Sequence, residues 1–147
     1  MRRPSLALAL LPFLLGAPAA CGKNKTGAPN TTALHVPGTP HTDEVLAAWR
    51  NASLAPERFS YAQPPPNTAT YCEHGTVRGV DTTICEYESD QALARGVQQL
   101  RDGWARIDAH TGVVLRAKRT TMAAVDRERR EPSGKTINEM AKIFRKL

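Results

Sequence analysis

Long apolar runs and aromatic residues are scarce in this chain. The longest apolar run covers about ten residues, Leu6–Leu15, and a transmembrane helix needs roughly 20. Aromatic side chains make up only 5% of the composition, which predicts a small core. A chain of 147 residues holds one domain, or one domain with a tail.

Catalytic and metal-binding motifs are also missing. The four histidines are scattered, and the chain contains no H-E-x-x-H, no nucleophile elbow and no C-x-x-C. We therefore assign no catalytic residue, metal or cofactor and expect a protein that is not an enzyme. An unrecognised active site remains the alternative, and a deep pocket that collects Asp108, His110 or Asp126 would favour it.

The first 20 residues have the three parts of a secretory signal peptide. Arg2 and Arg3 give a positive start, Leu6–Leu15 is the apolar centre, and small residues follow before Cys21. This pattern directs a chain out of the cytoplasm and is then removed. We expect residues 1–20 to be a signal peptide.

The segment Ala19-Ala20-Cys21-Gly22 resembles the lipobox of bacterial lipoproteins. That resemblance implies a lipid, such as palmitate, on Cys21, a membrane anchor and a location in the bacterial cell envelope, with the outer membrane compatible with Gly22. Pro18 departs from the aliphatic residue that is usual there. Ordinary cleavage would instead leave a soluble secreted protein with a spare thiol at Cys21.

Residues 21–41 read as a flexible tether. Residues 22–41 contain three prolines, three glycines and few aliphatic side chains, so they bury too little apolar surface to offset the entropy of ordering. We place a single small domain at residues 42–147.

Two segments rich in β-branched and aromatic residues, 71–77 and 80–87, flank Arg78-Gly79 and predict a hairpin with a two-residue turn. If Val77 opposes Val80, Cys72 falls directly opposite Cys85 at a non-hydrogen-bonded position. In an exported protein, this register predicts a structural disulfide.

The remaining pattern predicts helices from Thr42, from Ser89 to about Arg101 and from Ser133, with strands at 113–117 and 120–125. Gly103 is placed to end the second helix. We expect an α+β fold, with helices packed on one face of an antiparallel sheet of about four strands. Its order would be helix, hairpin, helix, hairpin, helix.

Positive charge gathers in the C-terminal third, where residues 101–147 carry twelve basic and six acidic side chains. Candidate anion-binding residues are Arg116, Lys118, Arg119, Arg127, Arg129 and Arg130. A solvated face is the plainer interpretation of such a charge run. If the face is used, an envelope protein, anionic lipid or an anionic polymer is a more accessible partner than nucleic acid, which we do not expect. The sequence favours a lipid-anchored, non-enzymatic binding or assembly module, with a secreted anion-binding domain as the alternative.

Overall fold

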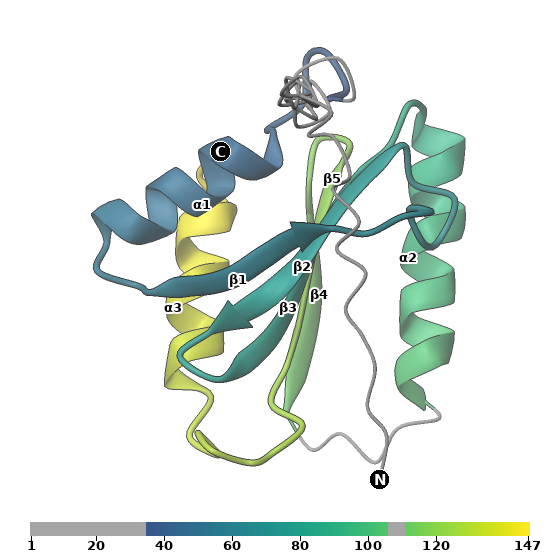
Figure 1. Ribbon diagram of the computed structural model, residues 1–147. Helices are drawn as coiled ribbons and strands as arrows, with labels where there is room; N and C mark the ends of the chain where they lie inside the picture. The colour runs from purple at the N-terminus through teal and green to yellow at the C-terminus, as the bar shows by residue number, and fades with distance from the viewer. Residues whose placement is uncertain (1–34, 106–110) are drawn as a thin grey trace, which may run out of the picture.

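The computed structural model describes residues 35–105 and 111–147, which form three helices and one antiparallel sheet (Figure 1). The elements in chain order are α1 (Thr42–Asn51), β1 (Pro56–Tyr61), β2 (Tyr71–Val77), β3 (Val80–Glu86), α2 (Asp90–Ala105), β4 (Gly112–Ala117), β5 (Thr120–Val125) and α3 (Lys135–Phe144).

The sheet has five strands in the order β1-β2-β3-β5-β4. The expectation of about four strands in two hairpins is therefore wrong, because β1 adds a fifth strand beside β2. A proline begins β1, and the register shifts between Glu57 and Ser60, where Arg58 takes a positive φ of 57°. This bulge breaks the strict alternation by which a strand is recognised in a sequence.

The helices cover both faces of the sheet, and this also corrects the expected arrangement (Figure 1). One core cluster joins α1 and α3 to the face that carries Ile84 and Met122, while a second joins α2 to the face that carries Cys85 and Tyr87. All six residues of β5 are buried. A strand buried on both sides needs a layer on each face.

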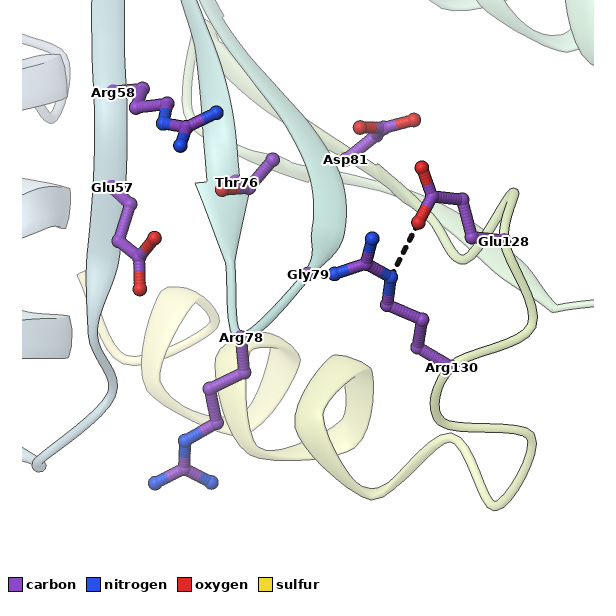
Figure 2. A pocket seen from close by; sticks show the side chains of 8 residues that line it. All are labelled: Glu57, Arg58, Thr76, Arg78, Gly79, Asp81, Glu128 and Arg130. Carbon is purple, nitrogen blue, oxygen red and sulfur yellow. Dashed lines mark ion pairs between the residues drawn. The ribbon is translucent and has the colours of Figure 1, made fainter.

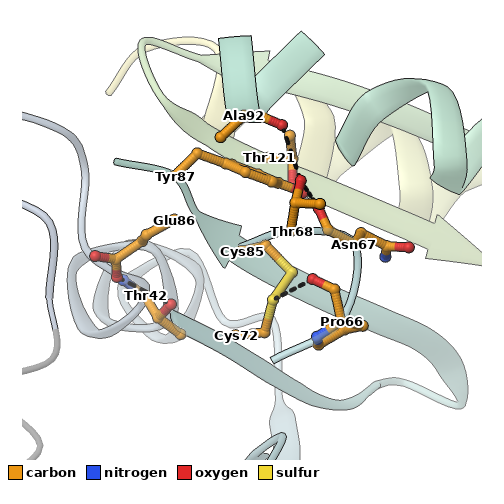
Figure 3. The surroundings of a disulfide bond; sticks show 10 residues. All are labelled: Thr42, Pro66, Asn67, Thr68, Cys72, Cys85, Glu86, Tyr87, Ala92 and Thr121. Atoms are coloured by element: carbon orange, nitrogen blue, oxygen red, sulfur yellow. Dashed lines mark hydrogen bonds between the residues drawn. A yellow bond between two sulfur atoms is a disulfide. The ribbon is translucent and has the colours of Figure 1, made fainter. Parts of the chain in front are cut away.

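The predicted β2–β3 hairpin and its disulfide are confirmed. Val77 pairs with Val80 and Cys72 with Cys85, and a disulfide joins the two cysteines with their Cα atoms 4.1 Å apart. Arg78 and Gly79 both have positive φ, at 49° and 82°, as a tight two-residue hairpin turn requires. The disulfide is fully buried on the α2 face of the sheet (Figure 3).

Residues 35–41 lie against the end of the sheet, although their composition placed them in the tether. The carboxylate of Glu86, at the end of β3, is fully buried. It accepts hydrogen bonds from His35 Nδ1 at 2.7 Å and from the backbone N–H groups of Val36 and Thr42, each at 2.9 Å. Figure 3 shows Glu86 directed at Thr42. This acidic side chain thus helps to fix the segment that leads into α1.

Close contact between α2 and the sheet depends on Gly96. A Cβ atom at this position would lie 2.3 Å from Cε1 of Tyr87, whose side chain is fully buried. Gly103 does not end α2, which continues to Ala105. A helix can pass through a glycine at a cost of about 1 kcal/mol when tertiary packing holds it in place.

Several sequence-based expectations fall outside the described residues. These are the signal peptide at residues 1–20, the lipidation of Cys21, the tether as far as residue 34, and the positions of Asp108 and His110. Within the part of the chain that is described, no helix has both the length and the apolar character needed to cross a membrane.

Candidate functional site

A groove runs between α2 and β4, the edge strand of the sheet. It consists of two adjoining hollows of about 420 Å³ and 230 Å³ that share Val97, Arg101 and Arg116. The other lining residues are Leu93, Ala94, Gln98, Val114, Leu115 and Arg145. We call this feature the α2–β4 groove.

Local structure explains why these residues meet. Leu93, Val97 and Arg101 are spaced four residues apart in α2, so they share one face of the helix. Val114 and Arg116 are alternate residues of β4, and their side chains therefore point to the same face of the sheet, the one that α2 covers. The apolar members of the two rows form the floor, and the arginines lie at its margin.

The charge at the margin of the groove is positive. Arg101, Arg116 and Arg145 come from α2, from β4 and from the residue that follows α3, and all three are exposed. The neighbouring carboxylate of Asp102 accepts a hydrogen bond from the Gln98 amide at 2.7 Å. Guanidinium groups bind carboxylates, phosphates and sulfates through paired hydrogen bonds. The arrangement therefore suits a ligand with an apolar body and anionic groups.

The six predicted anion-binding residues do not form one face. Arg116, Lys118 and Arg119 lie at the β4–β5 turn, whereas the other three follow the opposite end of β5. Arg119 links the segment before α1 to the segment after β3, because its guanidinium donates to the carbonyl oxygens of Pro37 at 2.7 Å and Glu88 at 2.5 Å. Of the first three residues, Arg116 belongs to the α2–β4 groove.

The remaining predicted residues, Arg127, Arg129 and Arg130, lie in the loop after β5. Arg130 lines a cleft of about 400 Å³ beside the β2–β3 turn, together with acidic and basic side chains from β1, from β3 and from the turn itself (Figure 2). Arg127 pairs with Asp81 at 3.0 Å, and Arg130 pairs with Glu128. Since carboxylates line the same cleft, its charge is mixed, and it suits an anion less well than the α2–β4 groove does.

Asp126 has a structural role in this loop. Its buried carboxylate accepts hydrogen bonds from the backbone N–H groups of Arg130 at 3.0 Å and Glu131 at 2.8 Å. This is the geometry of a loop cap, in which both carboxylate oxygens are occupied. Asp126 therefore stabilises the loop that follows β5.

An imidazole–carboxylate pair, His35 and Glu86, is present but faces inward. The side chain of His35 is 6% exposed and that of Glu86 is fully buried. The His35 ring is stacked on His41, with centroids 4.7 Å apart, and also contacts Tyr71. Burial and the hydrogen bond to Glu73 raise the pKa of the Tyr71 phenol above its usual value. Among residues 35–105 and 111–147, no group of three or more His, Cys, Asp or Glu side chains is arranged to hold a metal ion.

Sequence reasoning missed one residue of the α2–β4 groove and one set of contacts outside it. Arg101 was counted only as part of the basic C-terminal third, although its spacing from Leu93 and Val97 was a signal for a shared helix face. No sequence signal predicted the contacts of Glu86, because the segment that they hold, residues 35–42, is low in aliphatic residues and so resembles a tether. Comparison of the chain with protein-family models, with curated proteins and with solved structures found no match.

Proposed function

We propose that this protein is a lipid-anchored domain of a bacterial cell envelope that binds an anionic partner in the α2–β4 groove and carries out no catalysis. The observation that carries the binding role is the convergence of Arg101, Arg116 and Arg145 around an apolar floor. The anchor rests on the resemblance of residues 19–22 to a lipobox. Together they give a basic groove held close to a membrane.

The length of the intervening chain is consistent with this role. Thirteen residues separate Cys21 from His35, and even when fully extended they span at most about 45 Å. Several acyl chains on Cys21 would anchor stably, since each buried methylene contributes about 0.8 kcal/mol. A partner in the envelope would therefore meet the domain within a thin layer above the membrane.

The binding role is tested with heparin, a sulfated polysaccharide, as the probe. We expect the intact protein to be retained on heparin-agarose and to elute with salt, because salt screens charge pairs. In one variant, Arg101, Arg116 and Arg145 are changed to Gln. The matched control changes Arg50, Arg95 and Lys142 to Gln, which removes three exposed charges elsewhere. The groove variant should elute at clearly lower salt than the control, and equal elution of the two variants would reject the groove as the site.

The anchor is tested by the intact mass of native protein from a membrane fraction, before and after reduction. A chain that begins at Cys21 and carries acyl groups supports the anchor. A bare chain cleaved before Cys21 supports the second candidate function, a secreted anion-binding domain, which the unusual Pro18 favours. A gain of two protons on reduction reports the Cys72–Cys85 disulfide in either case.

A further inference from the structure

Along β4, every second residue directs its backbone N–H and C=O groups away from β5, toward the outer edge of the sheet. Asp126 N–H donates to the carbonyl oxygen of Thr111 at 3.0 Å, so these two residues form a hydrogen-bonded pair. Hydrogen-bonded and non-hydrogen-bonded pairs alternate along an antiparallel ladder. In the register of β4 with β5, the backbone N–H and C=O groups of Gly112, Val114 and Arg116 therefore point away from β5, toward the outer edge of the sheet.

The two edges of the sheet differ in how they are protected. The β1 edge begins with a proline and contains a bulge, two features that discourage pairing with a further strand. β4 has neither, and all six of its residues pair in continuous register with β5. Within the described residues, no strand pairs with the outer side of β4. This strand is thus a regular template about 20 Å long.

The arginines of the groove surround this edge. The side chains of Val114 and Arg116 lie on the α2 face of β4, close to Arg101, while Arg145 approaches from α3 on the opposite face. A strand added beside β4 would direct alternate side chains to these two faces. Acidic side chains on both faces of the added strand would therefore meet a guanidinium group.

We infer that β4 accepts an extended acidic peptide segment of a partner protein as a sixth strand. This inference rests on the proposed anion-binding role of the α2–β4 groove and adds the class of partner and the way it binds. Backbone hydrogen bonds to Gly112, Val114 and Arg116 hold the segment, and its carboxylates pair with the three arginines. A second copy of this chain fits less well, because joining two β4 edges brings two sets of the same arginines to one seam.

The probe is a capped, fluorescently labelled peptide of sequence Glu-Glu-Val-Val-Glu-Glu-Val-Val, whose glutamates fall on both faces of an added strand. It is titrated into the intact protein at low salt and followed by fluorescence anisotropy. A peptide with lysine in place of glutamate is the charge control. A third peptide, with N-methyl groups along one edge, keeps the charge but cannot add as a strand. We expect only the first peptide to bind. In its presence, amide hydrogen exchange at Gly112, Val114 and Arg116 should be slower.

The decisive variant is Val114→Pro, which removes one outward N–H group. Proline is tolerated on an edge strand when its N–H position faces solvent, so the β4–β5 pairing survives. We expect peptide affinity to fall about tenfold or more, whereas the control Val114→Thr, which keeps the N–H group, retains it. The circular dichroism spectrum of Val114→Pro and the amide hydrogen exchange of β5 should match those of the unsubstituted protein, which shows that the variant is folded and that the β4–β5 pairing is intact.

The outcomes separate this inference from the proposed function. If the N-methylated peptide or the Val114→Pro variant binds as well as its parent, strand addition is wrong, while a groove-dependent loss of heparin retention still supports anion binding. If the unsubstituted protein forms a dimer and Val114→Pro abolishes it, the strand that pairs with β4 belongs to a second copy of this chain, and the proposal of an acidic partner is wrong. If heparin elution does not depend on the groove arginines and the peptide does not bind, both proposals fail.

Discussion

The contact between Gly96 and Tyr87 gives a prediction in which two opposing effects can be compared. Gly96→Ala should gain about 1 kcal/mol from helix propensity, because glycine is that much worse than alanine inside a helix. The new Cβ would meet Cε1, the hydroxyl oxygen and Cζ of Tyr87 at 2.3, 2.5 and 2.6 Å. Each of these distances is well inside van der Waals contact.

The tyrosine ring has little freedom to move aside. It is fully buried, and Thr121 donates a hydrogen bond to its hydroxyl at 3.5 Å. Overpacking of a rigid core costs about 1–3 kcal/mol, and three atoms of one ring place this site at the upper end. We expect the free energy of unfolding of Gly96→Ala to fall by about 2 kcal/mol overall.

Gly103→Ala is the matched control in the same helix. Among the described residues, no atom lies within 4 Å of a Cβ built at this position, so we expect the propensity gain alone. Near the end of α2 we expect stabilisation of about 0.5 kcal/mol. Urea unfolding of the disulfide-intact protein measures both changes, provided that the m-values stay constant.

A double-mutant cycle tests the cause. In a Tyr87→Ala background the ring is gone, and Gly96→Ala should become neutral or stabilising. The reasoning is refuted if Gly96→Ala is as stable as the parent, or if its penalty persists without the ring.

Three further predictions concern the buried carboxylate, the disulfide and the start of α3. Glu86→Gln should destabilise the protein by about 2–3 kcal/mol, because one carboxylate oxygen that accepts a hydrogen bond is replaced by an amide NH₂ group facing another N–H donor. Amide hydrogen exchange at Val36 and Thr42 should become faster. Replacing Cys72 and Cys85 with Ala should cost about 3 kcal/mol in urea unfolding, from the entropy of a loop whose ends are 13 residues apart; unchanged stability would contradict this. The pKa of Glu131 is lowered by the Ser133 hydroxyl and by the N–H groups of Thr136 and Lys135. The stabilisation that this carboxylate gives is therefore complete above its ordinary pKa of 4.5 and is lost as the pH falls through the lowered pKa. Glu131→Gln should remove this part of the acid dependence of thermal unfolding.

The β2–β3 hairpin was predictable because several local signals agreed. A turn at Arg78-Gly79, alternating β-branched residues and two cysteines that meet in one register all specify the same pairing. The starts of α2 and α3 were also visible near Ser89 and Ser133. At α3, however, the carboxylate of Glu131 accepts the N–H groups of Lys135 and Thr136 at 2.9 and 2.7 Å. A cap from an upstream loop has no fixed spacing.

The placement of α2 opposite the other helices had a weaker signal. Thr120–Val125 reads as small and apolar residues without alternation, which is the pattern of a strand covered on both faces. The groove was harder still to predict. Arg101 and Arg145 are separated by 44 positions, and only the crossing of α2 and α3 on opposite sides of β4 brings them near each other.

The attachment of residues 35–42 to Glu86 also has a mechanical consequence. Any pull on the chain upstream of residue 35 reaches the domain at two places. One is Glu86 at the end of β3, which holds His35, Val36 and Thr42. The other is the β4–β5 turn, where Arg119 donates to the carbonyl oxygen of Pro37. β3 pairs with β2 on one side and with β5 on the other, so the load divides between two ladders. Tension from upstream is thus shared between the middle of the sheet and the β4–β5 turn.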